Sequence, residues 1–126
     1  MISKKELLAY IIGRKGCIHP FIISRIIAYS ELKWYSKYGK WLTDFKYIGF
    51  LKVFYIEGLK EIIEENKCFQ IINDCIKYIC HVPELNSDIK TFIDSALAEL
   101  SSLSMDQLNN KVVSYRFYDR LLNRDK

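Results

Sequence analysis

Four cysteines and two histidines are the side chains of this sequence best suited to hold a metal ion or to form cross-links. They are Cys17, Cys68, Cys75, Cys80, His19 and His81. Cys17-x-His19 and Cys80-His81 together could supply four zinc ligands, but structural zinc sites normally use closely spaced cysteine pairs, and the sequence has no Cys-x-x-Cys. Adjacent residues of a strand also point to opposite faces. We therefore expect no metal site and no cofactor, and interpret these residues as small buried side chains.

A disulfide is the second chemistry open to these cysteines. If residues 69–72 and 76–82 pair as a hairpin whose loop is 73–75, Cys68 falls opposite Cys80. A cross-strand disulfide between them is then an option in a cell that tolerates internal disulfides. A shift of one residue in the register would separate the two, so the sequence leaves this pairing open.

No catalytic motif occurs along the chain. The nucleophile elbow, the phosphate-binding loop, the His-Glu-x-x-His zinc motif and the glycine-rich dinucleotide motif are all missing. Carboxylates gather at Glu57, Glu61, Glu64 and Glu65, where a solvated acidic helix face explains them better than a catalytic pair. We expect a protein that binds and is not an enzyme.

Aromatic and basic residues alternate in the segment 33–41, Lys-Trp-Tyr-Ser-Lys-Tyr-Gly-Lys-Trp. Lysines can hold phosphates while aromatic rings pack on sugars or bases, so this pattern suits nucleic acid. The same segment could equally be the end of a core helix with exposed lysines. The candidate nucleic-acid-binding residues form a predicted basic patch of Arg14, Lys15, Arg25, Lys33, Lys37 and Lys40.

Charge is distributed unevenly along the 126 residues, whose formal net charge is +4. Residues 1–53 hold ten basic and three acidic residues, residues 54–106 hold four and ten, and residues 107–126 hold five and two. Such polarity indicates either a surface for an anionic partner or two halves that complement each other within the fold.

The length predicts one domain over residues 1–126. No apolar run reaches the roughly 18–20 residues of a membrane helix and no signal peptide is evident, so we expect a cytoplasmic protein without membrane contact.

Helical periodicity and capping residues predict a mainly α-helical protein. The capping box Ser3-x-x-Glu6 begins a helix over 4–12, which Gly13 would end. Pro20 begins the longest and most apolar helix, 20–38. Arg25 and Glu31 lie off the apolar stripe of this second helix. The other predicted elements are a short strand or irregular turn near 45–49, a helix over 53–65, a hairpin over 69–82 and a helix over 88–102 capped by Ser87. The capping box Ser104-x-x-Gln107 begins a last helix, from about 105 to 122 with a break. Helices followed by one β-hairpin fit a winged-helix-like α+β fold, with the hairpin as the wing.

The order of these elements resembles the Panacea-domain family, small and mostly helical proteins of prokaryotes and phages that are often encoded beside toxins. The matching stretches are Ile26-Ile27-Ala28-Tyr29-Ser30-Glu31, then Tyr38-Gly39-Lys40-Trp41-Leu42-Thr43, and later Leu103-Ser104-Met105-Asp106-Gln107-Leu108. The family's Gly-Pro pair after the short strand is missing at Ile48-Gly49-Phe50. The family's aromatic or histidine residues after the last motif are missing at Asn109-Asn110. The resemblance covers residues 20–115 and implies an antitoxin-like protein that binds a partner protein.

Two functions follow as hypotheses. The first is a DNA-binding, winged-helix-like transcription regulator that contacts duplex DNA through the predicted basic patch. The second is a protein-interaction module resembling an antitoxin, for which the acidic middle segment would dock a basic partner. The oligomeric state stays open, a homodimer included.

Overall fold

The computed structural model describes residues 1–124 as an α+β fold built around one long helix. The helices are α1 (Lys4–Lys15), α2 (Pro20–Tyr38), α3 (Leu59–Glu65), α4 (Ser87–Leu100), α5 (Met105–Val113) and α6 (Tyr118–Leu122). The strands are β1 (Lys46–Phe50), β2 (Val53–Glu57), β3 (Phe69–Ile72) and β4 (Cys75–Tyr78). Among the described residues none of these helices is both long and apolar enough to cross a membrane.

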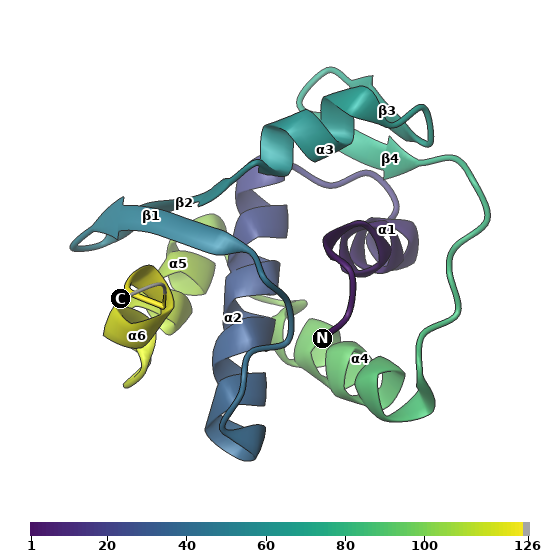
Figure 1. The fold of residues 1–126 in the computed structure, drawn as a ribbon. Coiled ribbons are helices and arrows are strands. Elements are labelled where there is room, and N and C mark those ends of the chain that lie inside the picture. Colours follow the sequence, from purple (N-terminus) through teal and green to yellow (C-terminus); the bar gives the residue numbers. More distant parts are fainter. Residues whose placement is uncertain (125–126) are drawn as a thin grey trace.

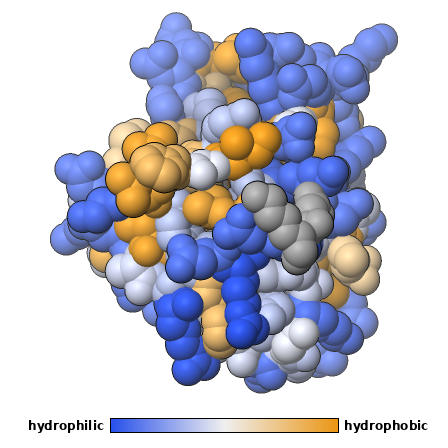
Figure 2. Space-filling view, turned by 60° about the vertical axis from the view of Figure 1, so that its left-hand side comes forward, coloured by the Kyte–Doolittle hydropathy of each residue, from blue (hydrophilic) through white to orange (hydrophobic). Residues whose placement is uncertain are grey.

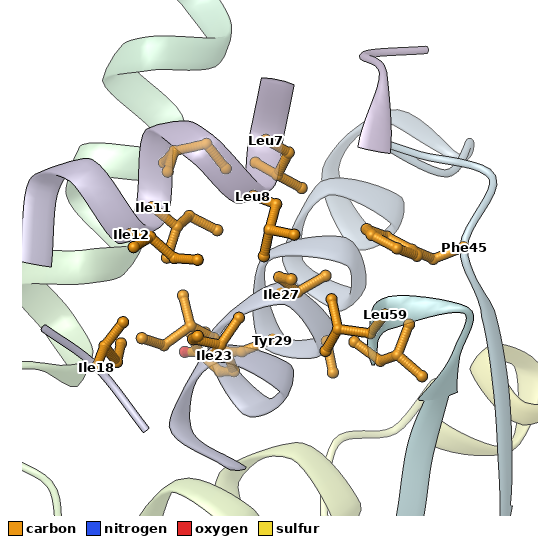
Figure 3. Close-up of a cluster of buried hydrophobic side chains, with 14 of the residues drawn as sticks. Leu7, Leu8, Ile11, Ile12, Ile18, Ile23, Ile27, Tyr29, Phe45 and Leu59 are labelled. Carbon is orange, nitrogen blue, oxygen red and sulfur yellow. The ribbon is translucent and has the colours of Figure 1, made fainter. Parts of the chain in front are cut away.

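Helix α2 runs through the centre of the molecule, with α1 and α4 on one side and α5 and α6 on the other (Figure 1). Leu7, Leu8, Ile11 and Ile12 of α1 are fully buried, and Figure 3 shows them directed toward α2 and its neighbours. One core cluster extends from α1 to the C-terminal helices.

Local signals set most helix ends. His19 precedes Pro20 at the start of α2 and its Nδ1 accepts a hydrogen bond from the Phe21 amide at 3.0 Å, while Gly39 ends the helix at φ 70°. The capping box Ser104–Gln107 begins α5 as predicted. Helix α1 does not end at Gly13 but continues to Lys15, and Asn86 rather than Ser87 caps α4. Gly13 instead allows close packing, since a Cβ there would lie 2.5 Å from Val82 Cγ2.

The structure contains two hairpins where the sequence predicted one. Residues 53–57 form strand β2 and not the start of a helix, because Phe54 and Ile56 are buried while Val53, Tyr55 and Glu57 are exposed, the two-residue period of a strand. Tyr47 pairs with Ile56 and Phe50 with Val53, so Leu51 and Lys52 form the turn, with Leu51 at φ 58°. The predicted helix over 53–65 is therefore reduced to α3, which follows Gly58 at φ 81°.

The second hairpin, β3–β4, is the predicted one with a different register. Ile72 pairs with Cys75, so the turn is Asn73-Asp74 alone, with Asn73 at φ 54°. Each hairpin is a separate two-stranded antiparallel sheet. The fold is therefore α+β with six helices and two hairpins over residues 1–124.

Candidate functional site

The six residues of the predicted basic patch lie in three different settings. Arg14 and Lys33 each pair with a carboxylate of α4, Arg14 Nε with Asp94 Oδ1 at 3.5 Å and Lys33 Nζ with Glu99 Oε2 at 2.9 Å. Their charges are therefore partly neutralised. Lys15, Lys37 and Lys40 are exposed and make no ion pair with any residue that the structure describes.

Arg25 is buried, and this corrects the prediction that it belongs to an exposed patch. Only 6% of the residue is accessible to solvent. Its guanidinium lies between the rings of Phe21 and Phe54, 3.9 and 4.0 Å from their centroids. Arg25 and Lys37 are also separated by about 18 Å along α2, so the six residues do not form one continuous surface.

The C-terminal end of α2 carries two of the exposed patch residues, Lys37 and Lys40, and residues from far along the chain lie beside it. Tyr35 and Trp41 stack with ring centroids 4.2 Å apart. Arg120 Nη1 donates to the Tyr35 hydroxyl at 2.8 Å, and Arg116 Nη2 donates to Ser36 Oγ at 3.2 Å. We call the set Tyr35, Lys37, Lys40, Trp41, Arg116 and Arg120 the basic–aromatic surface.

Sequence reasoning missed Arg116 and Arg120, although the basic excess of residues 107–126 pointed to this part of the chain. Their position beside α2 depends on how α5 and α6 fold back on it, and local pattern contains no such information. Trp34 is half-buried, with its ring 5.1 Å from Phe92 and 4.3 Å from Tyr38. Trp34 therefore contributes to packing at this end of the helix.

Two carboxylates of α4 organise the side chains around them. The Tyr10 hydroxyl donates to Asp94, and the Tyr29 hydroxyl donates to Glu99, which also pairs with Lys33 and Lys111. The hydrogen bond from Tyr29, with the lysines nearby, lowers the pKa of Glu99 to about 2. Burial and the hydrogen bond to Asp94 raise the pKa of Tyr10 to about 12. Asp94 and Glu99 therefore have hydrogen-bond and ion-pair partners within the fold, and these contacts join α4 to α1 and α2.

All four cysteines form disulfides. Cys68 is bonded to Cys80 and Cys17 to Cys75, with Cα–Cα distances of 5.2 and 5.3 Å. The Cys68–Cys80 bond is the pairing that the sequence left open. The register of the hairpin differs by one residue from the predicted one, because the Cys68 carbonyl accepts a hydrogen bond from the Ile79 amide. The chain bends at Cys80, and the two sulfur atoms still meet. The Cys17–Cys75 bond was not foreseen, since it joins the loop after α1 to strand β4. No three potential metal ligands converge anywhere in residues 1–124.

The outward face of the β1–β2 hairpin is apolar. Phe50, Leu51 and Val53 are 78%, 72% and 73% exposed, and Ile48 and Tyr55 are also exposed. Ile48 is opposite Tyr55 and Phe50 is opposite Val53 in the strand register, so these side chains share one face. Figure 2, which brings this side of the molecule forward, shows hydrophobic residues gathered at the surface. We call Ile48, Phe50, Leu51, Val53 and Tyr55 the hairpin face.

Comparison of the chain with protein-family models, with curated proteins and with solved structures finds no match. The resemblance to the Panacea-domain family thus stays a sequence-based hypothesis.

Proposed function

We propose that this chain is a non-enzymatic binding protein that contacts a partner protein through the hairpin face. The observation that carries the proposal is the exposure of four large apolar side chains on one side of β1–β2 and of Leu51 in the turn between these strands. A contiguous exposed apolar surface on a small folded protein usually marks an interaction site. The hairpin also presents Leu51 at a positive φ, a backbone strain that tends to be kept at functional positions.

The charges next to the hairpin face indicate what kind of partner would fit. Glu57, Glu61, Glu64 and Glu65 are all exposed on β2 and α3, which continue directly from the hairpin. Only Glu64 has an ion pair among the described residues, with Lys60 at 3.8 Å. A partner with an apolar centre and basic residues beside it would complement this surface. Such a partner agrees with the antitoxin-like role that the Panacea resemblance implies.

A pair of matched variants tests this proposal. Phe50→Thr with Val53→Thr keeps residues suited to strands but removes the centre of the hairpin face. Ile72→Thr with Ile79→Thr makes the same kind of change at two exposed positions of the other hairpin region. Tagged proteins are purified from the native host, and mass spectrometry identifies the proteins that co-purify.

The expected result is a specific protein that is recovered with the unmodified chain and the control, and lost with the Phe50/Val53 variant. Light scattering on the purified chain identifies self-association, in which case the partner is a second copy. Equal recovery with both variants, or no stable partner and a monomer at all concentrations, would contradict the proposal.

Nucleic acid is the second candidate partner, favoured by the basic–aromatic surface. Lys37 and Lys40 are exposed beside a stacked Tyr35–Trp41 pair, with Arg116 and Arg120 adjacent. Cations around an aromatic pair suit phosphates and bases. A DNA-binding regulator of winged-helix type would in addition need a hairpin acting as the wing while a helix occupies the major groove.

The disulfides also bear on the cellular compartment in which the protein works. Two disulfides favour an oxidising environment, whereas the cytoplasm predicted from the sequence would have to be one that tolerates internal disulfides. The thiol state of the protein in rapidly quenched native cells distinguishes the two, because alkylated free thiols would show a reducing compartment.

A further inference from the structure

A groove of about 560 Å³ lies between the two hairpins, beside the N-terminal end of α2. Its apolar walls are formed by Phe21 of α2, Ile56 of β2, Leu59 and Ile63 of α3, and Ile76 of β4. The exposed side chain of Ile71 lies at the same groove. This volume falls within the range of small-molecule sites, which are mostly apolar with a few polar groups that orient the ligand.

Arg25 is the charged group buried in the wall of this groove. Its Nε donates to Asn109 Oδ1 at 3.0 Å, and its Nη1 donates to Ser24 Oγ at 2.9 Å. Both acceptors are neutral, and no carboxylate of residues 1–124 pairs with the guanidinium. Arg25 is therefore a buried cation without a counter-ion in this part of the chain.

A buried cation without a carboxylate partner is unfavourable, since desolvation disfavours the charged form and the attraction from the aromatic rings and from Tyr118 offsets only part of the loss. Burial accordingly lowers the pKa of Arg25. Phe21 and Phe54 cover both faces of the guanidinium, so a ligand can reach only its edge. The Nη2 nitrogen makes no hydrogen bond to any described residue, and each η nitrogen carries two N–H groups. An edge of this kind matches the two oxygens of a carboxylate.

We propose that this groove binds a small amphipathic carboxylate of the medium-chain fatty-acid type, with its carboxylate on the open edge of Arg25 and its apolar chain along Leu59, Ile63 and Ile76. The site takes its specificity from one buried cation and its affinity from apolar walls. It is separate from the proposed protein contact, although Tyr55 borders both surfaces.

Calorimetric titration with decanoate, below its micelle-forming concentration, tests the site. Decanol and decyltrimethylammonium have the same chain with a neutral and a cationic headgroup. We expect decanoate to bind at least about tenfold more tightly than decanol, because hydrogen bonds to charged groups contribute that much or more. Equal affinity for decanoate and decanol, or no binding of decanoate, would overturn the proposal.

Two variants address the role of Arg25 directly. Arg25→Met removes the charge while keeping an apolar side chain of similar length, and decanoate should then bind no better than decanol. Asn109→Asp places a carboxylate where Oδ1 now accepts from Arg25 at 3.0 Å, and so supplies an internal counter-ion. This variant should weaken decanoate binding by about tenfold or more while leaving decanol binding unchanged. Unchanged decanoate binding in either folded variant contradicts the assignment.

A third pair keeps the test decisive if Arg25→Met fails to fold. Ile71→Trp fills the groove from its exposed side, whereas Ile79→Trp places the same ring at an exposed position outside the groove. Only Ile71→Trp should reduce decanoate affinity, and an equal effect of both variants would refute the placement of the ligand in this groove.

A short apolar peptide with a free C-terminal carboxylate is the last ligand to be tested. If it binds more tightly than decanoate, the site recognises a chain terminus and the fatty-acid assignment is wrong.

Discussion

Glu31 and Arg124 lie 93 positions apart and form a buried ion pair, with Arg124 Nη1 2.8 Å from Glu31 Oε2. Glu31 also accepts hydrogen bonds from the amides of Leu42 and Thr43 at 2.7 and 2.8 Å and from the Thr43 hydroxyl at 2.7 Å. A second nitrogen of Arg124 donates to the Thr43 carbonyl. One carboxylate in the middle of α2 thus holds both the loop before β1 and the end of the described chain.

Arg124→Ala should destabilise the protein by about 3 kcal/mol, because it leaves the Glu31 carboxylate buried without a cation. Urea unfolding measures the change. The control is Arg120→Ala, an exposed arginine one turn away that donates to Tyr35, whose loss should cost under about 1 kcal/mol. Equal losses in the two variants would show that the buried pair adds nothing beyond surface contacts.

Removal of the disulfides should destabilise the protein in the order of their loop lengths. Cys17 and Cys75 are 58 positions apart and Cys68 and Cys80 are 12 apart. Chain entropy then predicts losses of about 4 kcal/mol for Cys17→Ser with Cys75→Ser and about 3 kcal/mol for Cys68→Ser with Cys80→Ser. Denaturant unfolding of both double variants checks the order. A reductant should reduce the stability of the unmodified chain but not that of a variant lacking all four cysteines.

Glu99 should make stability fall at acid pH. Its folded pKa of about 2 lies below its ordinary value of 4.5, so its contribution is fully present above about pH 4.5 and is lost as the pH falls toward 2. Because the side chain is about one third exposed, screening reduces this contribution to about 1 kcal/mol. Glu99→Gln should be less stable than the unmodified chain at pH 7 and equal to it below pH 2. A difference that does not change between these pH values would contradict the linkage.

Lys37→Ala with Lys40→Ala tests the nucleic-acid hypothesis. If both lysines contact phosphates, the slope of log affinity against log salt for duplex DNA should fall in magnitude by about two units. The control is Lys67→Ala with Lys77→Ala, which removes the same charge from exposed positions outside the basic–aromatic surface. An equal reduction in both variants would show a general charge effect, and unchanged binding in the Lys37/Lys40 variant would leave this surface without a nucleic-acid role.

Trp41→Ala separates packing from binding at the same surface. Trp41 is half-buried, stacked on Tyr35 and covered by the Arg124 guanidinium, whose carbon is 4.9 Å from its ring centroid. Its loss should destabilise the fold by about 2–3 kcal/mol, less than a fully buried tryptophan would. Thermal unfolding measures this value. A change under about 0.5 kcal/mol would show that the ring is free to serve a ligand.

The sequence by itself determined the elements whose signals are local. Helix α2 begins at Pro20 and ends before Gly39 as predicted, and the Ser104–Gln107 capping box forms, because caps and periodicity act within one or two turns. Local signals failed at residues 53–57. The apolar residues Phe54, Ile56 and Leu59 fit a strand followed by a helix as well as they fit one helix, and pairing with β1 decided between the two.

Only the tertiary structure decided which polar residues are buried and which surfaces are exposed. Arg25 and Glu31 read as solvent-facing residues of α2, yet both are buried, since α5, the β1–β2 hairpin and Arg124 supply their partners from positions far along the chain. Tertiary packing also produced the hairpin face, the basic–aromatic surface and the Cys17–Cys75 bond. Each depends on how segments distant in the sequence pack together, and neither periodicity nor capping specifies such packing.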